Sequence, residues 1–287
     1  MSIPTTEPTR FAGPPDPAFI DRATERSSPW EMVVSLVRYR ELVRNLVLRD
    51  LRLKYRGSVL GFLWSMLNPI VMVAASTMAF KYILRVGQER YVFFVLLGVL
   101  AWSFFANSAT MSTRSMIDSA GLLKSVKFPR AVLPVATVVF NLAQYVLTAL
   151  ILLPVMLIAY GEAPSWPMLG FPLVLALQVL FTVGLAMALS VATVFFRDIR
   201  HLVEVSISFL FWTTPVLYSL SQVDAPLRSV LQFSPMSPFV VSYQRIFHQG
   251  VWPEASTWLL AVAYAAASLA IGGLVFMALE DRVGEQL

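Results

Sequence analysis

The part of this sequence best suited to chemistry is a short run of cations, Arg49, Arg52, Lys54 and Arg56. Directly after it, residues 57–80 carry no charged side chain. Cations at the edge of such an apolar stretch are typical of the membrane surface that holds anionic headgroups. Seven cations lie within the 19 residues from Arg38 to Arg56, which is more than a topology signal needs. We therefore expect the four cations to receive an anionic lipid headgroup; an anchoring helix with stop-transfer charges is the alternative.

A helix lying in the membrane interface is expected to position these cations, and we place it at residues 30–56. Residues 32–46 present one apolar face, and the arginines from 49 to 56 then form a basic stripe with apolar residues opposite. This pattern is typical of an interfacial amphipathic helix. The two apolar faces are out of register, so we predict either a bend near residues 47–49 or two helices.

The composition indicates that the whole chain is an all-α integral membrane protein. It has 287 residues, of which 57% are hydrophobic and 14% charged, whereas soluble domains average about 25% charged residues. There is no cysteine, which excludes disulfides and thiol chemistry, and two isolated histidines cannot form a metal cluster. We expect neither a metal nor a cofactor bound by this chain. The formal charge of +5 lies beside apolar segments, so the predicted partner is the membrane surface and not nucleic acid.

Six apolar segments are long enough, or nearly so, to cross the hydrocarbon as helices, which takes about 20 residues. The predicted spans are about 58–82, 91–112, 131–158, 169–195, 203–222 and 256–279. A further apolar stretch is short and contains Pro235 and Pro238, so we predict short re-entrant helices at 224–250, before the last span. Residues 1–29 contain six prolines and little aliphatic content, which predicts a disordered tail and no signal peptide.

The distribution of the cations predicts the orientation in the membrane. With the N-terminus inside, the inner segments hold 17 of the 22 lysines and arginines, and the outer loops hold five. The tail contributes three of the 17, and the remaining 14 against five still favour this orientation. Six spans then leave both termini in the cytoplasm.

The driving force for any transport is expected to come from outside this chain. The sequence lacks the phosphate-binding pattern GxxxxGK[ST], and its carboxylates lie in loops or at span ends, whereas proton and sodium carriers place them inside spans. We therefore predict a transport subunit that is not itself an enzyme and that depends on a cytoplasmic ATP-hydrolysing partner. Two inner loops, 114–130 and 195–201, are candidates to receive that partner; ordinary charged loops are the alternative. The candidate coupling residues are Asp118, Leu122, Leu123, Lys124, Lys127, Arg197, Asp198 and Arg200.

Five blocks of sequence resemble the ABC-2-type permeases that export lipid-linked polysaccharides such as O-antigen, capsule and teichoic acid. They are RDLRLKYRGSVLGFLWSMLNP at 49–69, LLGVLAWSFFANS at 96–108, LLKSVKFPRAVLPVATVVFNL at 122–142, FFRDIRHLVEV at 195–205 and FSPMSPFVVSYQRIFHQG at 233–250. The blocks follow the family's order and spacing over most of the chain. Residues 57–287 are therefore identified as an ABC-2-type transmembrane domain by resemblance.

The resemblance implies a homodimer bound to two ABC nucleotide-binding subunits, which would hold ATP and magnesium, in the inner membrane of a bacterium. It implies that residues 49–56 belong to a gate helix and that the loop at 115–129 contains a coupling helix. It also implies a channel ringed by aromatic side chains, on which sugar rings stack. The candidate lining residues are Phe62, Trp64, Tyr82, Trp102, Phe104, Phe105, Phe211, Trp212 and Tyr218, with packing or lipid contact as the alternative for each.

Two other kinds of function are open at the level of sequence. One is an ABC-2 permease for a small drug or lipid. The other, from a different class, is an ion-coupled carrier or a scaffold for membrane glycosyltransferases. Recovery of a partner ATPase whose turnover depends on this chain would exclude the carrier and the scaffold.

Overall fold

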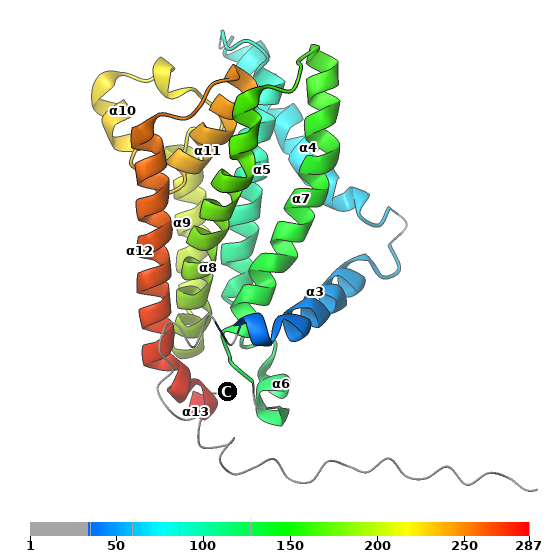
Figure 1. The fold of residues 1–287 in the computed structure, drawn as a ribbon, viewed down its shortest axis with the longest axis vertical. Helices are drawn as coiled ribbons and strands as arrows, with labels where there is room; N and C mark the ends of the chain where they lie inside the picture. The colour runs from blue at the N-terminus through cyan, green and yellow to red at the C-terminus, as the bar shows by residue number, and fades with distance from the viewer. Residues whose placement is uncertain (1–33, 35, 59, 86, 127, 287) are drawn as a thin grey trace, which may run out of the picture.

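The computed structural model of this chain is a bundle of packed helices (Figure 1). It describes residues 34, 36–58, 60–85, 87–126 and 128–286. Within these residues every regular element is a helix, which confirms the predicted all-α fold. The disordered tail predicted at 1–29 lies outside the described residues.

Five helical segments in the described part of the chain are long and apolar enough to cross a membrane. They are α4 with the π-helix η1 (Leu63–Thr77 and Met78–Ile83), α5 (Tyr91–Ser112), α7 (Val132–Tyr160), η2 with α8 (Trp166–Gly170 and Phe171–Phe195), and α12 with η5 (Ala255–Leu279 and Glu280–Arg282). Each lies on a predicted span. The chain is therefore a multi-pass membrane protein.

The remaining predicted span, 203–222, is occupied by a shorter helix. α9 (Ile199–Thr213) has 15 residues and is about 22 Å long at 1.5 Å per residue, which is less than the roughly 30 Å of the hydrocarbon. The next residue but one, Pro215, explains the end of α9, because the residue before a proline avoids helical dihedrals. Thr214 is accordingly extended, with ψ at 135°. The count of six spanning helices stays a prediction.

The non-helical backbone at 214–219 packs closely against α5. The Tyr91 hydroxyl donates a hydrogen bond to the carbonyl of Leu217 at 2.8 Å. A Cβ atom on Gly98 would lie 3.0 Å from the carbonyl oxygen of Val216, so only a glycine leaves room for this backbone. Irregular backbone at membrane depth survives where protein supplies its hydrogen-bond partners, and α5 supplies them here.

Shorter helices complete the two ends of the bundle. They are α6 (Ala120–Ser125), the 3₁₀ helix η3 (Leu220–Gln222), α10 (Ala225–Leu231), α11 (Ser237–Tyr243), the π-helix η4 (Gln244–Gln249) and α13 (Val283–Gln286). α10, α11 and η4 lie where we predicted re-entrant helices. α11 packs against α5, α8 and α12 and reaches into the bundle, whereas α10 lies at its outer corner (Figure 1).

The predicted amphipathic segment contains α3 (Arg40–Tyr55), which lies obliquely across the lower part of the bundle (Figure 1). Of the two predicted alternatives, the bend near 47–49 is wrong, because α3 is continuous there; the helical segment is instead interrupted at Tyr39, which lies in a turn. Leu46 and Val47 are buried and belong to a cluster with residues of α7, α8 and α12.

Two glycines determine where the first span begins. Gly57 and Gly61 have left-handed φ angles of 73° and 49°, a conformation that glycine adopts without steric cost. They turn the chain between α3 and α4. For this reason α4 begins at Leu63, although the uncharged stretch begins at residue 57.

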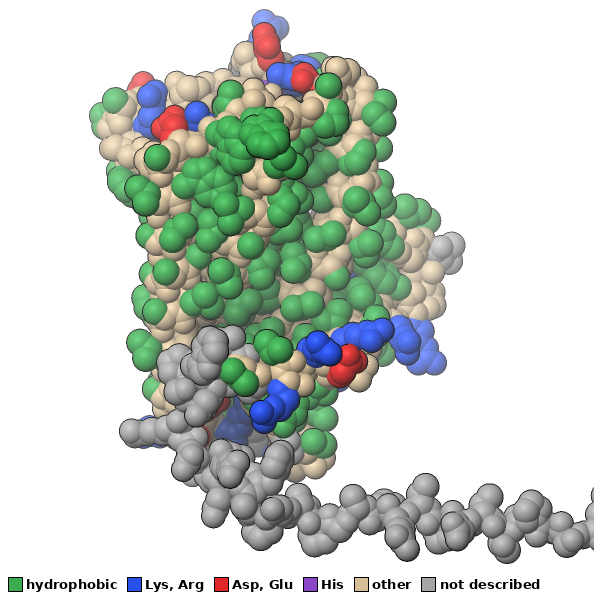
Figure 2. All heavy atoms as spheres, in the orientation of Figure 1, with side chains coloured by type: hydrophobic (Ala, Val, Ile, Leu, Met, Phe, Trp, Pro, Cys, Tyr) green, Lys and Arg blue, Asp and Glu red, His purple; other side chains and the backbone are tan. Residues whose placement is uncertain are grey.

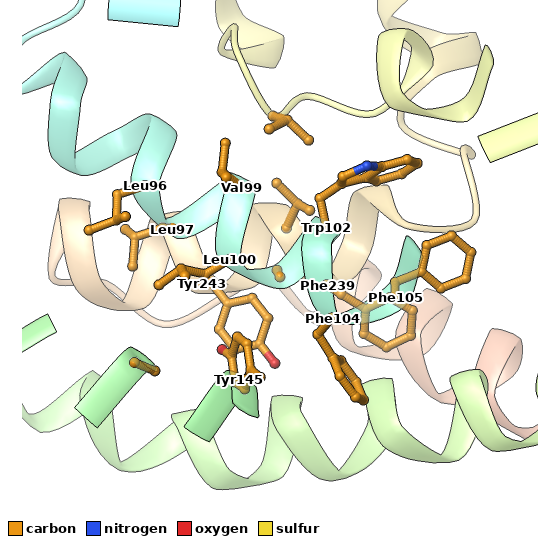
Figure 3. Packing of buried hydrophobic residues seen from close by; sticks show 14 of the residues in the cluster. Leu96, Leu97, Val99, Leu100, Trp102, Phe104, Phe105, Tyr145, Phe239 and Tyr243 are labelled. Atoms are coloured by element: carbon orange, nitrogen blue, oxygen red, sulfur yellow. The ribbon is translucent and has the colours of Figure 1, made fainter. Parts of the chain in front are cut away.

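The buried side chains form two clusters. The larger one centres on α5, whose Trp102, Phe104 and Phe105 interleave with aromatic rings of α7 and α11 (Figure 3). The smaller one lies at the end of the bundle that the distribution of the cations predicts to be cytoplasmic. It joins α3, α7, α8, α12 and α13 with the loop before α6, through residues that include Leu46, Val47, Met116, Phe140, Phe276 and Val283.

Candidate functional site

The cations of α3 form a distinct band on the surface of the molecule. Figure 2 shows lysine and arginine side chains gathered along α3, with a largely hydrophobic belt between them and the charged groups at the opposite end. Arg49 forms an ion pair with Asp50 at 2.8 Å. Among the described residues, neither Arg52 nor Arg56 has a carboxylate within ion-pair distance. Unpaired cations beside an apolar belt are suited to an anionic ligand.

A surface hollow lies along the outward side of α3. Its volume is about 550 Å³, and its lining combines cations with apolar and amide side chains: Asn45, Leu48, Arg49, Arg52, Leu53 and Arg56. Three of the four predicted headgroup residues therefore share one hollow. The arginines offer forked N–H donors suited to phosphate oxygens, and the leucines offer contact to an adjoining hydrocarbon chain.

Lys54, the fourth predicted headgroup residue, points to the bundle. Its ammonium donates a hydrogen bond to Oε1 of Gln144 in α7, and it lies 5.7 Å from the ring centre of Phe140 and 5.8 Å from that of Tyr55. Partial burial lowers the pKa of Lys54 from its ordinary value. Aromatic faces attract the cation in place of water.

Gln144 is the residue that joins α3 and α4 to α7. Its Oε1 accepts hydrogen bonds from Lys54, from the Tyr55 hydroxyl at 3.3 Å and from the Ser65 hydroxyl at 3.1 Å. The two hydroxyls are 2.6 Å apart. The Gln144 side chain is buried, and its Nε2 has no hydrogen-bond partner among the described residues.

The cluster lies near the middle of the candidate membrane span α7. Gln144 lies 12 positions beyond Val132, where α7 begins, which corresponds to about 18 Å along the helix. A polar cluster inside a membrane span raises the free energy of the folded protein unless its groups are fully hydrogen-bonded or take part in function. The basic face of α3 thus extends from the hollow to the interior of the bundle.

The predicted channel aromatics fall into two groups. Trp102, Phe104 and Phe105 are buried in the core of a single chain, with 5%, 2% and 1% of their surfaces exposed. Trp102 packs edge-on against Phe105 and Phe211, with ring centres 5.6 and 5.5 Å apart. These three rings are therefore packing residues in this conformation, because neighbouring side chains cover their faces.

The other group lies on the helices at the rim of the bundle. Trp64 of α4, Tyr82 of η1 and Trp212 of α9 are more than half exposed. Phe62, Phe211 and Tyr218 are half-buried beside them. The exposed rings of α4, η1 and α9 are thus the ones available to a ligand or to a second subunit, and their role in a channel stays a prediction.

The predicted coupling residues lie on two segments between long helices, which the cation distribution predicts to be cytoplasmic. α6 lies below the bundle (Figure 1) and carries the half-buried Leu122 and Leu123 and the exposed Lys124, while Asp118 is exposed just before it. Lys127 lies outside the described residues. Arg197 and Asp198 are exposed in the turn between α8 and α9, and Arg200 is half-buried. Their contact with a partner stays a prediction.

Gln144 was missed by the reading of the sequence. It contacts residues 90, 89 and 79 positions away along the chain, so local spacing does not reveal its partners. A signal was nonetheless present, because Asn141 and Gln144 are the amides of an otherwise apolar span. Polar residues inside spans mark helix contacts or functional sites.

The fold and the site define a multi-pass helical membrane protein with an oblique basic helix at one end of the bundle. Residues 41–248 match the profile of the family described as ABC-2 type transporter. The chain belongs to this family.

Two relatives from different bacteria have the same name. The chain is 36% identical to the "O-antigen export system permease protein RfbA" of Myxococcus xanthus over 261 residues, which are 89% of this chain and 99% of that protein. It is 32% identical to the Klebsiella pneumoniae protein of that name over 240 residues, 83% of this chain and 92% of that protein.

Proposed function

We propose that this chain is the permease subunit of an ABC exporter that moves a lipid-linked polysaccharide out of the cytoplasm across the bacterial inner membrane. The relatives carry the name of O-antigen export permeases. The observation that carries the proposal is the group of cations at the C-terminal end of α3, Arg52, Lys54 and Arg56, which have no carboxylate partners among the described residues. A phosphate or pyrophosphate linking a glycan to its lipid is the anion that such a set would bind.

The chain acts in this proposal with a second copy of itself. α4 and α9 lie at the rim of the bundle, and α9 exposes Glu204, Ser206 and Ser208 along with its apolar residues. Polar groups facing lipid are unfavourable, so a subunit interface at α9 would shield them. The exposed aromatic rings of α4, η1 and α9 would then face the space between the two copies, where sugar rings could stack on them.

Two ATP-hydrolysing subunits supply the driving force and hold ATP and magnesium themselves. Their contacts are the cytoplasmic segments at α6 and at residues 197–200. The chain has no phosphate-binding motif of its own, which supports a subunit without catalytic activity. Both termini face the cytoplasm in this arrangement, in agreement with the positive-inside rule.

The test is a triple substitution of Arg49, Arg52 and Arg56 with glutamine. We expect export of the lipid-linked glycan to be lost while the permease and its ATPase still purify together. The matched control replaces Arg40 and Arg44, on the same helix but outside the hollow, with glutamine and should export normally. Undiminished export by the triple variant rejects the role of α3, and transport by the purified chain without any ATPase rejects the whole proposal.

A further inference from the structure

Both lone pairs of the Gln144 amide oxygen are filled. Three donor groups lie within hydrogen-bond distance of it: Lys54, Tyr55 and Ser65. The Tyr55 and Ser65 hydroxyls are 2.6 Å apart, so one gives its single hydrogen to the other, and only the second donates to Gln144 together with Lys54. The orientation of the amide follows from these contacts, because an ammonium donates only and must face the oxygen. If Lys54 leaves, a hydroxyl still donates to the oxygen, which therefore does not remain unpaired.

Lys54 is the donor for which exchange of Gln144 for another acceptor is most favourable. Its ammonium has three N–H groups, and Gln144 supplies the one hydrogen-bond acceptor for it in the described part of the chain. Tyr55 and Ser65 keep each other as partners at 2.6 Å if the ammonium departs. A phosphate oxygen is a stronger acceptor for an ammonium than a neutral amide, because the hydrogen bond is assisted by charge on both sides.

The opposite edge of the amide also favours a second arrangement. Gln144 Nε2 is buried and has no partner in the part of the chain that the structure describes, and an unpaired buried donor destabilises the arrangement that contains it. The observed cluster therefore contains one unpaired donor, on the amide nitrogen, and an ammonium whose hydrogen-bond acceptor is neutral. It is poised to change when a better acceptor arrives.

We infer that Gln144 is a positioning residue of the entrance: it holds the Lys54 ammonium at membrane depth and hands it to a phosphate oxygen of the cargo's anionic headgroup. The inference rests on the proposed function, since it requires a cargo with such a headgroup. On release of Lys54, α3 loses a hydrogen bond that ties it to α7. Recognition of the headgroup and movement of the gate helix are thereby the same event.

The experiment measures ATP turnover of the complete permease–ATPase complex in phosphatidylcholine vesicles that contain increasing amounts of a polyprenyl pyrophosphate. Gln144→Glu places a carboxylate beside Lys54, which the pyrophosphate must displace. We expect the half-maximal concentration of the probe to rise about tenfold, because a charged acceptor replaces a neutral one, with little change in maximal turnover. Gln232→Glu is the matched control, since Gln232 is exposed on the outer side and should respond as wild type.

A second variant removes both hydroxyls. In Tyr55→Phe combined with Ser65→Ala, no hydroxyl is left to donate to the Gln144 oxygen when Lys54 leaves, so release leaves that oxygen unpaired and Lys54 is held more firmly. The half-maximal concentration should rise about threefold, as expected for loss of one neutral hydrogen bond in the released state. Wild-type responses in both variants overturn the inference, and so does a loss of maximal turnover at an unchanged half-maximal concentration, which indicates a merely structural residue.

The two proposals fail in different ways. If the wild-type complex does not respond to polyprenyl pyrophosphate, the proposed cargo is wrong and the inference falls with it. If wild type responds and both variants match it, only the role of Gln144 is wrong.

Discussion

Gly184 of α8 and Gly272 of α12 are in backbone contact: a Cβ atom on Gly272 would overlap the carbonyl oxygen of Gly184. Close approach of this kind lets two membrane helices pack by van der Waals contact along their backbones. α8 and α12 consequently form the most closely associated helix pair of the described bundle. The contact demands glycine at both positions, because neither backbone has space to withdraw.

Replacing Gly272 with alanine is expected to separate α8 from α12 and to destabilise the protein by at least about 3 kcal/mol, at the upper end of overpacking effects. Gly273→Ala is the matched control, because nothing lies within 4 Å of the Cβ position at its neighbour Gly273. Thermal unfolding of the two detergent-solubilised variants measures the difference. Equal unfolding temperatures would show that the helices do not pack in this way.

Two tryptophans distinguish packing from contact with cargo. Trp102 is 5% exposed and Trp212 is 64% exposed. Trp102→Ala should cost about 3–5 kcal/mol, as for other buried aromatic truncations, and lower the yield of folded protein. Trp212→Ala should change stability by less than about 0.5 kcal/mol and reduce glycan export. If Trp102→Ala were stable but inactive in export, its ring would belong to the channel after all.

The buried His248 predicts a dependence of stability on pH. Its Nε2 lies 3.0 Å from the carbonyl oxygen of Glu89, and Nδ1 has no partner among the described residues. Burial lowers the pKa of His248 below its ordinary 6.5, and the nearby Arg90 lowers it further. The hydrogen bond that the ring donates to the Glu89 carbonyl and the charge of the Glu89 carboxylate act in the opposite direction. The unfolded chain therefore binds a proton that the folded chain excludes.

The sign of the effect follows from this difference in bound protons. Stability should be complete above pH 6.5, the ordinary pKa of the residue, and should decline as the pH falls from there to the folded pKa. His248→Gln keeps an N–H group and should flatten this decline in unfolding temperature between pH 7.5 and 5. His201→Gln is the control, because His201 is exposed. An unchanged slope in the His248 variant contradicts the prediction.

The loop before α6 offers a further test, because it contains one buried and one exposed residue close together. Met116 is fully buried and Asp118 is exposed. Met116→Ala should destabilise the chain by about 2–5 kcal/mol through the cavity it leaves, whereas Asp118→Ala should leave the unfolding temperature unchanged. Co-purification of the ATPase then reports on Asp118 separately. An Asp118 variant that retains the ATPase at wild-type level argues against its role in coupling.

Much of the fold could be predicted because its signals are local. α5 spans Tyr91–Ser112, the predicted bounds, since a charge-free apolar run ends at Arg90 and Arg114 on its two sides. α9 was predicted too long because hydropathy counts apolar residues and does not register that Pro215 prevents the preceding residue from being helical. The break at Tyr39 could likewise not be predicted from the periodicity of the segment, because that periodicity carries no information on how α3 packs.

The site was predictable only in its charges. The cations of α3 are evident from composition, and the arginines do share one hollow. The partner of Lys54 was not evident, because Gln144 lies 90 residues away in sequence and only folding brings the two together. Trp102 shows the reverse case: its residue type suggests a ligand contact, and its burial follows from the three-dimensional arrangement of α5.

The smaller buried cluster joins the two ends of the described chain, because Val47, near its beginning, and Val283, near its end, both belong to it. A polypeptide that traverses a bilayer an odd number of times has its extremities on opposite surfaces, and the five long helices alone would have that result. The predicted sixth traversal, by α9 and the irregular stretch after Thr213, would bring both ends of the described chain to one surface. A topology assignment that accepts only uninterrupted helices would miss this traversal.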